Sequence, residues 1–118
     1  MSVNGLAQAV EASNFVTAFH GYGVSTADIA RVVRIDVDTV CAWKTDGPKP
    51  GEDAYIQLVG LREIVLMLSD SLTPRGVGQW LHAKNRLLDG KRPLDALGEG
   101  QQQKVWEAGR ALVAGFYI

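Results

Sequence analysis

Residues 26–45 read TADIARVVRIDVDTVCAWKT, and this pattern predicts two short helices joined by a tight turn. Apolar residues fall on one face of each expected helix, at Ile29, Val33, Val40 and Trp43. Ala30 supplies the small residue that such a pair needs where the two backbones cross. The stretch therefore predicts a helix-turn-helix, in which Arg34 occupies the turn position where glycine is most common and Ile35 fills the turn.

The second of these helices would contact DNA through its outward residues if it entered the major groove. Those candidates are Val37, Asp38, Thr39 and Ala42, with Lys44 reaching a phosphate. Carboxylates at Asp36 and Asp38 are repelled by phosphates, and the net charge of −1 is low for a dedicated DNA-binding protein. The pair of helices either binds operator DNA as a dimer or serves only in packing and dimerisation.

Apolar residues recur at helical spacing outside this stretch, and no run alternates long enough to predict a strand. The expected helices cover residues 3–20, 26–33, about 37–46, 53–72, a segment after Pro74, a short turn at 93–97, and 101–114. Ser25 or Thr26 with Asp28 predicts one helix start, and Thr73 before Pro74 predicts another. The sequence thus predicts an all-α fold with three parts: a helix-turn-helix part over 1–51, a long connecting helix over 52–72, and a small helical domain over 73–118.

The long connecting helix carries a regular apolar stripe, whose members are Leu58, Leu61, Val65, Leu68 and Leu72. Steps of three and four residues are typical of a helix that packs against another helix. The stripe predicts a homodimer, unless other helices of the same chain cover it.

Composition excludes several classes of protein. Of the 118 residues, 47% are hydrophobic, which predicts a folded globular chain of one unit or two small lobes. The single cysteine, Cys41, permits no internal disulfide, and neither a signal peptide nor a membrane span is present in the sequence pattern. These features predict a cytoplasmic protein that does not enter a membrane.

The sequence shows no combination of side chains that would form a catalytic site, so we expect a protein that is not an enzyme. His20 and His82 lie far apart without metal-ligand spacing, and no nucleotide-binding glycine motif is present, so neither a metal nor a cofactor is expected. Cys41 follows the buried candidate Val40, and its expected role is that of a small packed residue.

The C-terminal half carries a more specific pattern. It reads Trp80-Leu81, Asn85-Arg86-Leu87-Leu88, Gly90, Pro93-Leu94-Asp95-Ala96-Leu97, Gly100, Val105 and Gly115. This combination resembles the toxin-binding domain of the Xre/MbcA/ParS-type antitoxins over residues 73–115. The helix-turn-helix ahead of it matches the family's N-terminal part, so the resemblance covers most of the chain.

The resemblance implies a protein partner, namely a RES-domain toxin that destroys NAD and that the antitoxin holds inactive. It also implies that the complex represses its own promoter. The candidate toxin-binding residues are Trp80, Asn85, Arg86, Lys91, Arg92, Gly115, Phe116, Tyr117 and Ile118. Lys84 belongs to the same basic cluster on the loop.

The physical roles of these residues leave alternatives open. Trp80 and Trp106 are large enough to be core residues or interface anchors. Asn85 and Asp95 are expected to bond backbone groups and pin the loop between helices. The apolar residues Phe116-Tyr117-Ile118 either plug the toxin's NAD pocket or pack on the chain's own core.

Two other functions compete with the antitoxin hypothesis. One is a stand-alone helix-turn-helix transcription regulator that acts as a dimer, and the other is a purely structural interaction module. Residues 1–60 contain four Lys and Arg against seven Asp and Glu, which disfavours the regulator. Residues 61–118 contain eight against six, so the basic half of the chain is the C-terminal one.

Overall fold

The computed structural model of the chain describes residues 13–43 and 49–115. Residues 13–20 are helical and are followed by α2 (Thr26–Val33), α3 (Val37–Ala42) and α4 (Glu52–Leu68). The second half contains α5 (Pro74–His82), the 3-10 turn η1 (Arg86–Leu88), α6 (Pro93–Gly98) and α7 (Gln102–Val113). These two ranges hold no strand, only an isolated bridge between Asn85 and Lys91, and the predicted all-α fold is confirmed.

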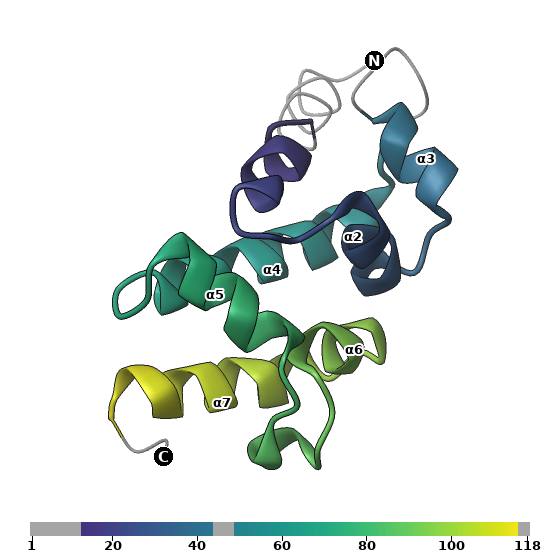
Figure 1. The fold of residues 1–118 in the computed structure, drawn as a ribbon. Coiled ribbons are helices and arrows are strands. Elements are labelled where there is room, and N and C mark those ends of the chain that lie inside the picture. The colour runs from purple at the N-terminus through teal and green to yellow at the C-terminus, as the bar shows by residue number, and fades with distance from the viewer. Residues whose placement is uncertain (1–12, 44–48, 116–118) are drawn as a thin grey trace.

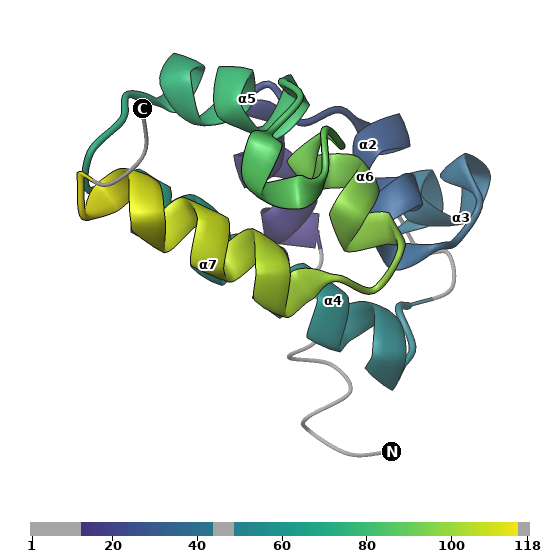
Figure 2. The same ribbon diagram turned by 90° about the horizontal axis from the view of Figure 1, so that it is seen from below.

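Helix α4 packs against α2 and has α7 along its side (Figures 1 and 2). Helix α2 packs against α3, α4 and α6, while α6 also packs against α5 and α7. One apolar cluster contains buried residues from all of these helices, among them Val16, Ile29, Leu58, Leu81, Leu94 and Val105. The N-terminal and C-terminal parts of the predicted division therefore share one core in the described residues.

The apolar stripe of α4 is buried inside the chain itself. Leu58, Leu61, Val65 and Leu68 are all at most 2% exposed, and Leu72 is half-buried against the same core. The chain's own helices thus cover the stripe, and it cannot serve as the dimer face that its spacing predicts. The apolar side chains that α4 leaves exposed are instead Ile56 and Leu66.

Helix α4 ends at Leu68, four residues before the predicted end at Leu72. The Ser69 hydroxyl donates a hydrogen bond to the Val65 carbonyl, 2.7 Å away. The amides of Asp70 and Ser71 then bond carbonyls three residues earlier, which tightens the chain into a turn. Short polar side chains that compete for backbone bonds end the helix here, although the apolar spacing continues.

Both predicted helix starts in described residues have the expected caps. The Ser25 hydroxyl accepts from the Asp28 amide, and the Asp28 carboxylate accepts from the Ser25 amide, which makes a complete capping box. The Thr73 hydroxyl accepts from the Gly76 amide, and Pro74 is the first residue of α5. These caps place the N-terminal ends of α2 and α5 at the residues that the sequence indicates.

Helices α2 and α3 occupy the two predicted positions, with Ile29, Ala30, Val33, Val40 and Trp43 buried. Arg34 takes the left-handed conformation, with φ 61°, in the turn between them. Cys41 is exposed, so the expectation that it is a packed residue is wrong. It lies on the outer face of α3, because only Val40 and Trp43 of this segment point into the core.

None of the helices in the described ranges is both long enough and apolar enough to cross a lipid bilayer.

Candidate functional site

The loop between α5 and α6 is organised by Asn85, which is only 2% exposed. Its side-chain oxygen accepts a hydrogen bond from the Leu87 amide at 2.9 Å. Its backbone amide donates to the Lys91 carbonyl, and its carbonyl accepts from the amides of Leu88 and Gly90. Asn85 therefore pins the loop through backbone groups, as the sequence predicts, and Gly90 at φ 82° lets the chain turn back.

Asp95 acts differently from its predicted role, because its carboxylate bonds side chains and not backbone groups. Arg92 Nε and Nη2 donate to its two oxygens at 2.8 and 2.9 Å, which is a bidentate pair. Arg31 Nη1 of α2 donates to the same carboxylate at 2.6 Å, from 64 residues away in the chain. The hydrogen bonds from Arg92 and Arg31 hold the pKa of Asp95 well below its ordinary value. Asp95 thus ties α6 to α2.

Replacing Asp95 by asparagine is expected to lower the free energy of unfolding by about 1.5 kcal/mol at neutral pH. Because folding depresses the pKa of this carboxyl, its contribution is present above the unfolded-state value, near pH 4, and is lost as the pH falls below it. The difference between wild type and Asp95→Asn should therefore shrink between about pH 5 and pH 2. Urea unfolding across this range measures it, and Asp70→Asn, at an exposed position, is the control. A difference that is independent of pH would contradict this account.

The basic cluster predicted on the loop is partly neutralised. Lys91 pairs with Glu99, which raises the pKa of Lys91, and Arg92 pairs with Asp95. Lys84 and Arg86 are exposed, and among the described residues neither forms an ion pair. Only two of the four cations are therefore available for a partner's acidic groups.

Trp80 and Trp106 are both half-buried and pack against the core, and a contact of either with a partner stays a prediction. The Nε1 atom of Trp80 is buried and has no hydrogen-bond partner in the described part of the chain. Trp106 lines an apolar hollow of about 240 Å³ together with Met67, Arg110, Val113 and Ala114. Sequence reasoning missed this hollow, because Met67 comes from α4 and the other residues from α7 and its C-terminal cap.

Helix α7 ends next to this hollow, just before the apolar end of the sequence. The amide of Gly115 donates to the Leu112 carbonyl, and Gly115 has φ 82°, which is the usual way in which a glycine terminates a helix. The other three tail candidates, Phe116, Tyr117 and Ile118, lie outside the described residues. The predicted tail can therefore be followed only as far as Gly115.

The candidate DNA-contacting residues of α3 form no basic surface. Val37 and Asp38 are exposed, while Thr39 and Ala42 are half-buried. The Thr39 hydroxyl donates to the Asp36 carboxylate at 2.6 Å, which holds that negative charge beside the helix start. Lys44, the predicted phosphate contact, lies outside the described residues. DNA binding by α3 stays a prediction. The exposed carboxylates of Asp36 and Asp38 disfavour it, because DNA phosphates repel them.

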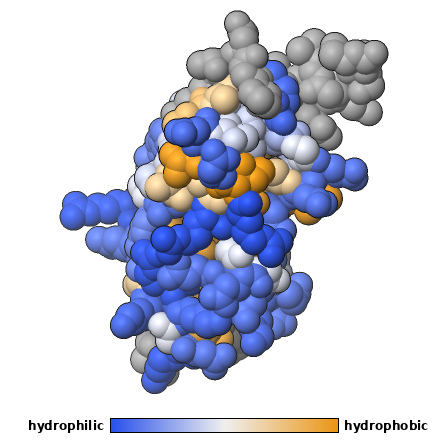
Figure 3. All heavy atoms as spheres, turned by 90° about the vertical axis from the view of Figure 1, so that its right-hand side faces the viewer, coloured by the Kyte–Doolittle hydropathy of each residue, from blue (hydrophilic) through white to orange (hydrophobic). Residues whose placement is uncertain are grey.

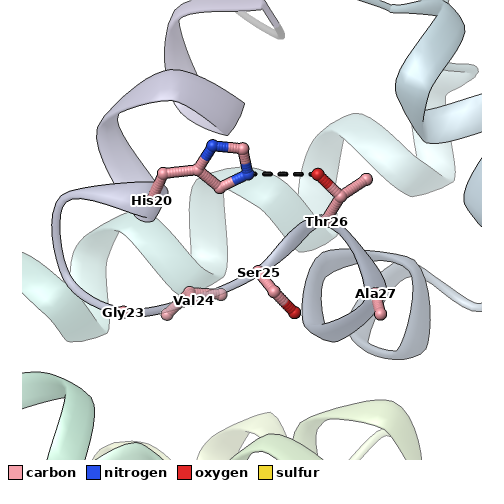
Figure 4. Close-up of a pocket in the computed structure, with 6 residues that line it drawn as sticks. All are labelled: His20, Gly23, Val24, Ser25, Thr26 and Ala27. Atoms are coloured by element: carbon pink, nitrogen blue, oxygen red, sulfur yellow. Dashed lines mark hydrogen bonds between the residues drawn. The ribbon is translucent and has the colours of Figure 1, made fainter.

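The two histidines serve as local hydrogen-bonding residues. Figure 4 shows the His20 ring turned toward Thr26, with 3.1 Å between His20 Nε2 and the Thr26 hydroxyl, beside an open hollow of about 560 Å³. His82 Nε2 lies 3.0 Å from the Gly23 carbonyl and 3.4 Å from the Asp28 carboxylate. The Ser25 hydroxyl, which lines the hollow beside His20, caps α2. Within residues 13–43 and 49–115, no three His, Cys, Asp or Glu side chains gather as a metal site would require.

Comparison with known proteins gives a consistent result, although no protein-family model matches the chain. The chain is 48% identical over 113 residues to the probable mycobacterial cidal antitoxin Rv3188 of Mycobacterium tuberculosis, and the match covers 96% of both chains. It is 24% identical over 118 residues, the full length of both, to the mycobacterial cidal antitoxin MbcA of Mycobacterium tuberculosis and Mycobacterium bovis.

The fold also matches a solved structure, the crystal structure of the M. tuberculosis MbcT–MbcA toxin–antitoxin complex. The TM-score is 0.75 at 23% identity, over 92% of this chain and 98% of that chain. At this identity the match shows a shared fold. The family predicted from the pattern between Trp80 and Gly115 is confirmed by the relatives, which are antitoxins and not enzymes. This chain belongs to the mycobacterial cidal antitoxin family.

Proposed function

We propose that this chain neutralises a RES-domain, NAD-consuming toxin by binding it directly in the cytoplasm, as the antitoxin of a type II pair. The observation that carries the proposal is the 48% identity to a probable cidal antitoxin over nearly the whole of both chains. MbcA, a more distant relative with the same fold, forms a complex with the toxin MbcT. The RES domain and the NAD chemistry come from the resemblance carried by the C-terminal pattern.

The proposed toxin contact is the C-terminal part of the chain. Its loop is held rigid by Asn85, so the exposed Arg86 is presented in a defined position. Lys91 and Arg92 flank it and carry their own acidic partners. Trp80 is half-buried, and it contributes more to holding α5 on the core than to a free contact surface.

The second proposed contact is the end of the chain. Helix α7 stops at Val113, and Gly115 turns the backbone before the apolar residues 116–118. In our proposal Phe116 and Tyr117 occupy the apolar walls of the toxin's NAD pocket.

We do not extend the proposal to autoregulatory DNA binding. The exposed residues of α3 are apolar or acidic, and residues 1–60 carry fewer cations than anions. A protein with this charge balance gains little from counterion release on DNA. Operator binding and the stand-alone regulator therefore remain alternatives that no observation on the structure favours. The homodimer predicted from the apolar stripe of α4 is not proposed either, because that stripe is buried within the chain.

Growth and cellular NAD test the proposal when the toxin gene is expressed with and without this chain. We expect the neighbouring open reading frame alone to stop growth and deplete NAD, and this chain to restore both. The matched control is the same chain with Leu61→Ala and Leu68→Ala, two core substitutions that should prevent folding at a cost of several kcal/mol. A neighbour that leaves NAD unchanged would remove the RES-toxin proposal, and binding to the upstream DNA would then favour the regulator.

A further inference from the structure

The apolar hollow beside Trp106 lies at the end of α7, which is at the left of Figure 1. We call it the α7-end hollow. Its volume is about 240 Å³, and its walls are Met67, Trp106, Arg110, Val113 and Ala114. By contrast, the lower part of the opposite side of the molecule, which Figure 3 shows, is mainly hydrophilic. An apolar side chain placed in the hollow would remove both itself and these walls from water, which is favourable.

Helices α4 and α7 supply the two sides of the hollow and pack against each other. A Cβ added at Gly109 of α7 would lie 2.6 Å from Met67 Cε, so the Met67 methyl group already lies against α7. Arg110 is exposed and forms no ion pair within residues 13–43 and 49–115. The α7-end hollow therefore combines apolar walls with one cation that is available to an occupant.

The backbone at the end of α7 turns the chain back toward this hollow. Gly115 follows the cap residue Ala114 and has φ 82°, and its amide donates to the Leu112 carbonyl at 3.0 Å. These are features of the Schellman motif. In that motif the residue after the glycine, here Phe116, frequently makes an apolar contact with a residue five or six positions before it. Arg110 is at one of those positions and is a wall of the hollow.

The distance from Gly115 to the hollow is short. An extended chain advances about 3.5 Å per residue, so residues 116–118 reach about 10 Å from Gly115. Val113 and Ala114, two walls of the hollow, directly precede Gly115. Arg110 comes about 7.5 Å before it along the helix axis. Phe116 is the first large apolar side chain after the turn, so it is the occupant that the geometry favours.

We propose that Phe116 of the free antitoxin docks in the α7-end hollow of its own chain. Its ring packs on Met67 and Val113, pairs with the ring of Trp106 and has the Arg110 guanidinium over one face. This docking needs no toxin. One consequence rests on the proposed function, in which the same residues enter the toxin. The chain end then has two alternative sites, and the toxin has to draw Phe116 out of the hollow.

The methyl group of Met67 reports on the contact directly. Met1 and Met67 are the two methionines, so labelling methionine methyls with ¹³C gives at most two NMR signals, and Met67→Leu assigns the one from the hollow. We expect a nuclear Overhauser effect between this methyl and an aromatic ring, and its loss with a changed methyl shift in Phe116→Ala. Lys104→Ala, at an exposed position that does not line the hollow, is the control and should leave the signal unchanged. A Met67 signal that is the same with and without Phe116 would overturn the proposal.

Thermal unfolding measures the same contact through a double-mutant cycle. Phe116→Ala should lower the unfolding midpoint of the wild-type chain by about 4 °C. In a chain that already carries Met67→Ala the further loss should be below about 1 °C, because one wall of the hollow is then missing. In a chain that carries Lys104→Ala the full loss should remain. Equal losses in the two backgrounds would mean that Phe116 does not pack on Met67, and the proposal would be wrong.

Adding the toxin distinguishes this inference from the proposed function. If residues 116–118 enter the toxin, the Met67 signal of the complex should move to its position in Phe116→Ala. Met67→Ala should also tighten toxin binding about fivefold, because it releases the chain end beforehand, and should have no such effect in a chain that lacks residues 116–118. A Phe116 contact that persists in the complex would support the docking and contradict entry of the chain end into the toxin. A contact that is absent from the free chain overturns the docking whatever the toxin does.

Discussion

Gly78→Ala is expected to lower the free energy of unfolding by about 3 kcal/mol. Gly78 lies inside α5, where the helix meets the turn at residues 21–23. A Cβ at this position would lie 2.3 Å from the carbonyl oxygen of Tyr22. A backbone atom cannot rotate away as a side chain does, so α5 or the turn would have to shift. That shift would also disturb the contact of His82 with the Gly23 carbonyl.

Urea unfolding followed by circular dichroism measures this loss, and Gly109→Ala is the matched control. Gly109 is also buried inside a helix, but its added Cβ would meet chiefly the Met67 methyl group at the end of a flexible side chain. Met67 can adopt another rotamer, and alanine favours a helix over glycine by about 1 kcal/mol, so Gly109→Ala should cost little or nothing. Equal losses in the two variants would show that the Tyr22 contact is not the cause.

The parts of the fold that sequence predicts well depend on residues close together in the chain. The capping box of Ser25 and Asp28 and the Thr73–Pro74 start each involve at most four consecutive residues, and the structure has both. The inner faces of α2 and α3 follow in the same way from helical spacing. These signals are local, so no knowledge of the rest of the chain is needed to interpret them.

The parts that sequence could not predict depend on distant residues. The α4 stripe has the same spacing whether a second chain or α7 covers it, and only the tertiary packing decides. Asp95 was expected to bond its own loop, but Arg31 approaches from 64 residues away and competes for its carboxylate. Cys41 follows the buried Val40, yet its orientation on α3 exposes it. In each case the outcome depends on tertiary packing, which local spacing does not specify.

The candidate site likewise has features that the sequence could predict and features that it could not. Asn85 could be assigned from the sequence, because an asparagine before a tight turn bonds backbone groups nearby. The hollow beside Trp106 could not, because it needs α4 and α7 side by side. The role that we propose for residues 116–118 involves a partner, so it has to be tested with the toxin present.

Deleting residues 116–118 is expected to abolish inhibition of the toxin while leaving the antitoxin folded and able to bind. Every hydrogen bond and ion pair described above involves residues 13–43 and 49–115, so the deletion removes none of them. Helix α7 already ends at Val113, and Gly115 closes it through the Leu112 carbonyl. The loop around Asn85 therefore keeps its shape. The deletion removes from the antitoxin only the residues that, in our proposal, fill the NAD pocket of the toxin.

The measurement compares NAD consumption by the toxin with toxin binding by calorimetry, for the full chain and the truncated one. A plug that alone blocks substrate should give an uninhibited complex, with binding weakened by no more than about a hundredfold, since the rest of the interface remains. Replacing Phe116, Tyr117 and Ile118 by serine keeps the length and should act like the deletion, because the apolar groups are what fill the pocket. Lys104→Ala on α7 should change neither quantity. Full inhibition by the truncated chain would place the block elsewhere in the interface, and lost binding by a truncated chain that still unfolds cooperatively would make the tail the main contact instead of a plug.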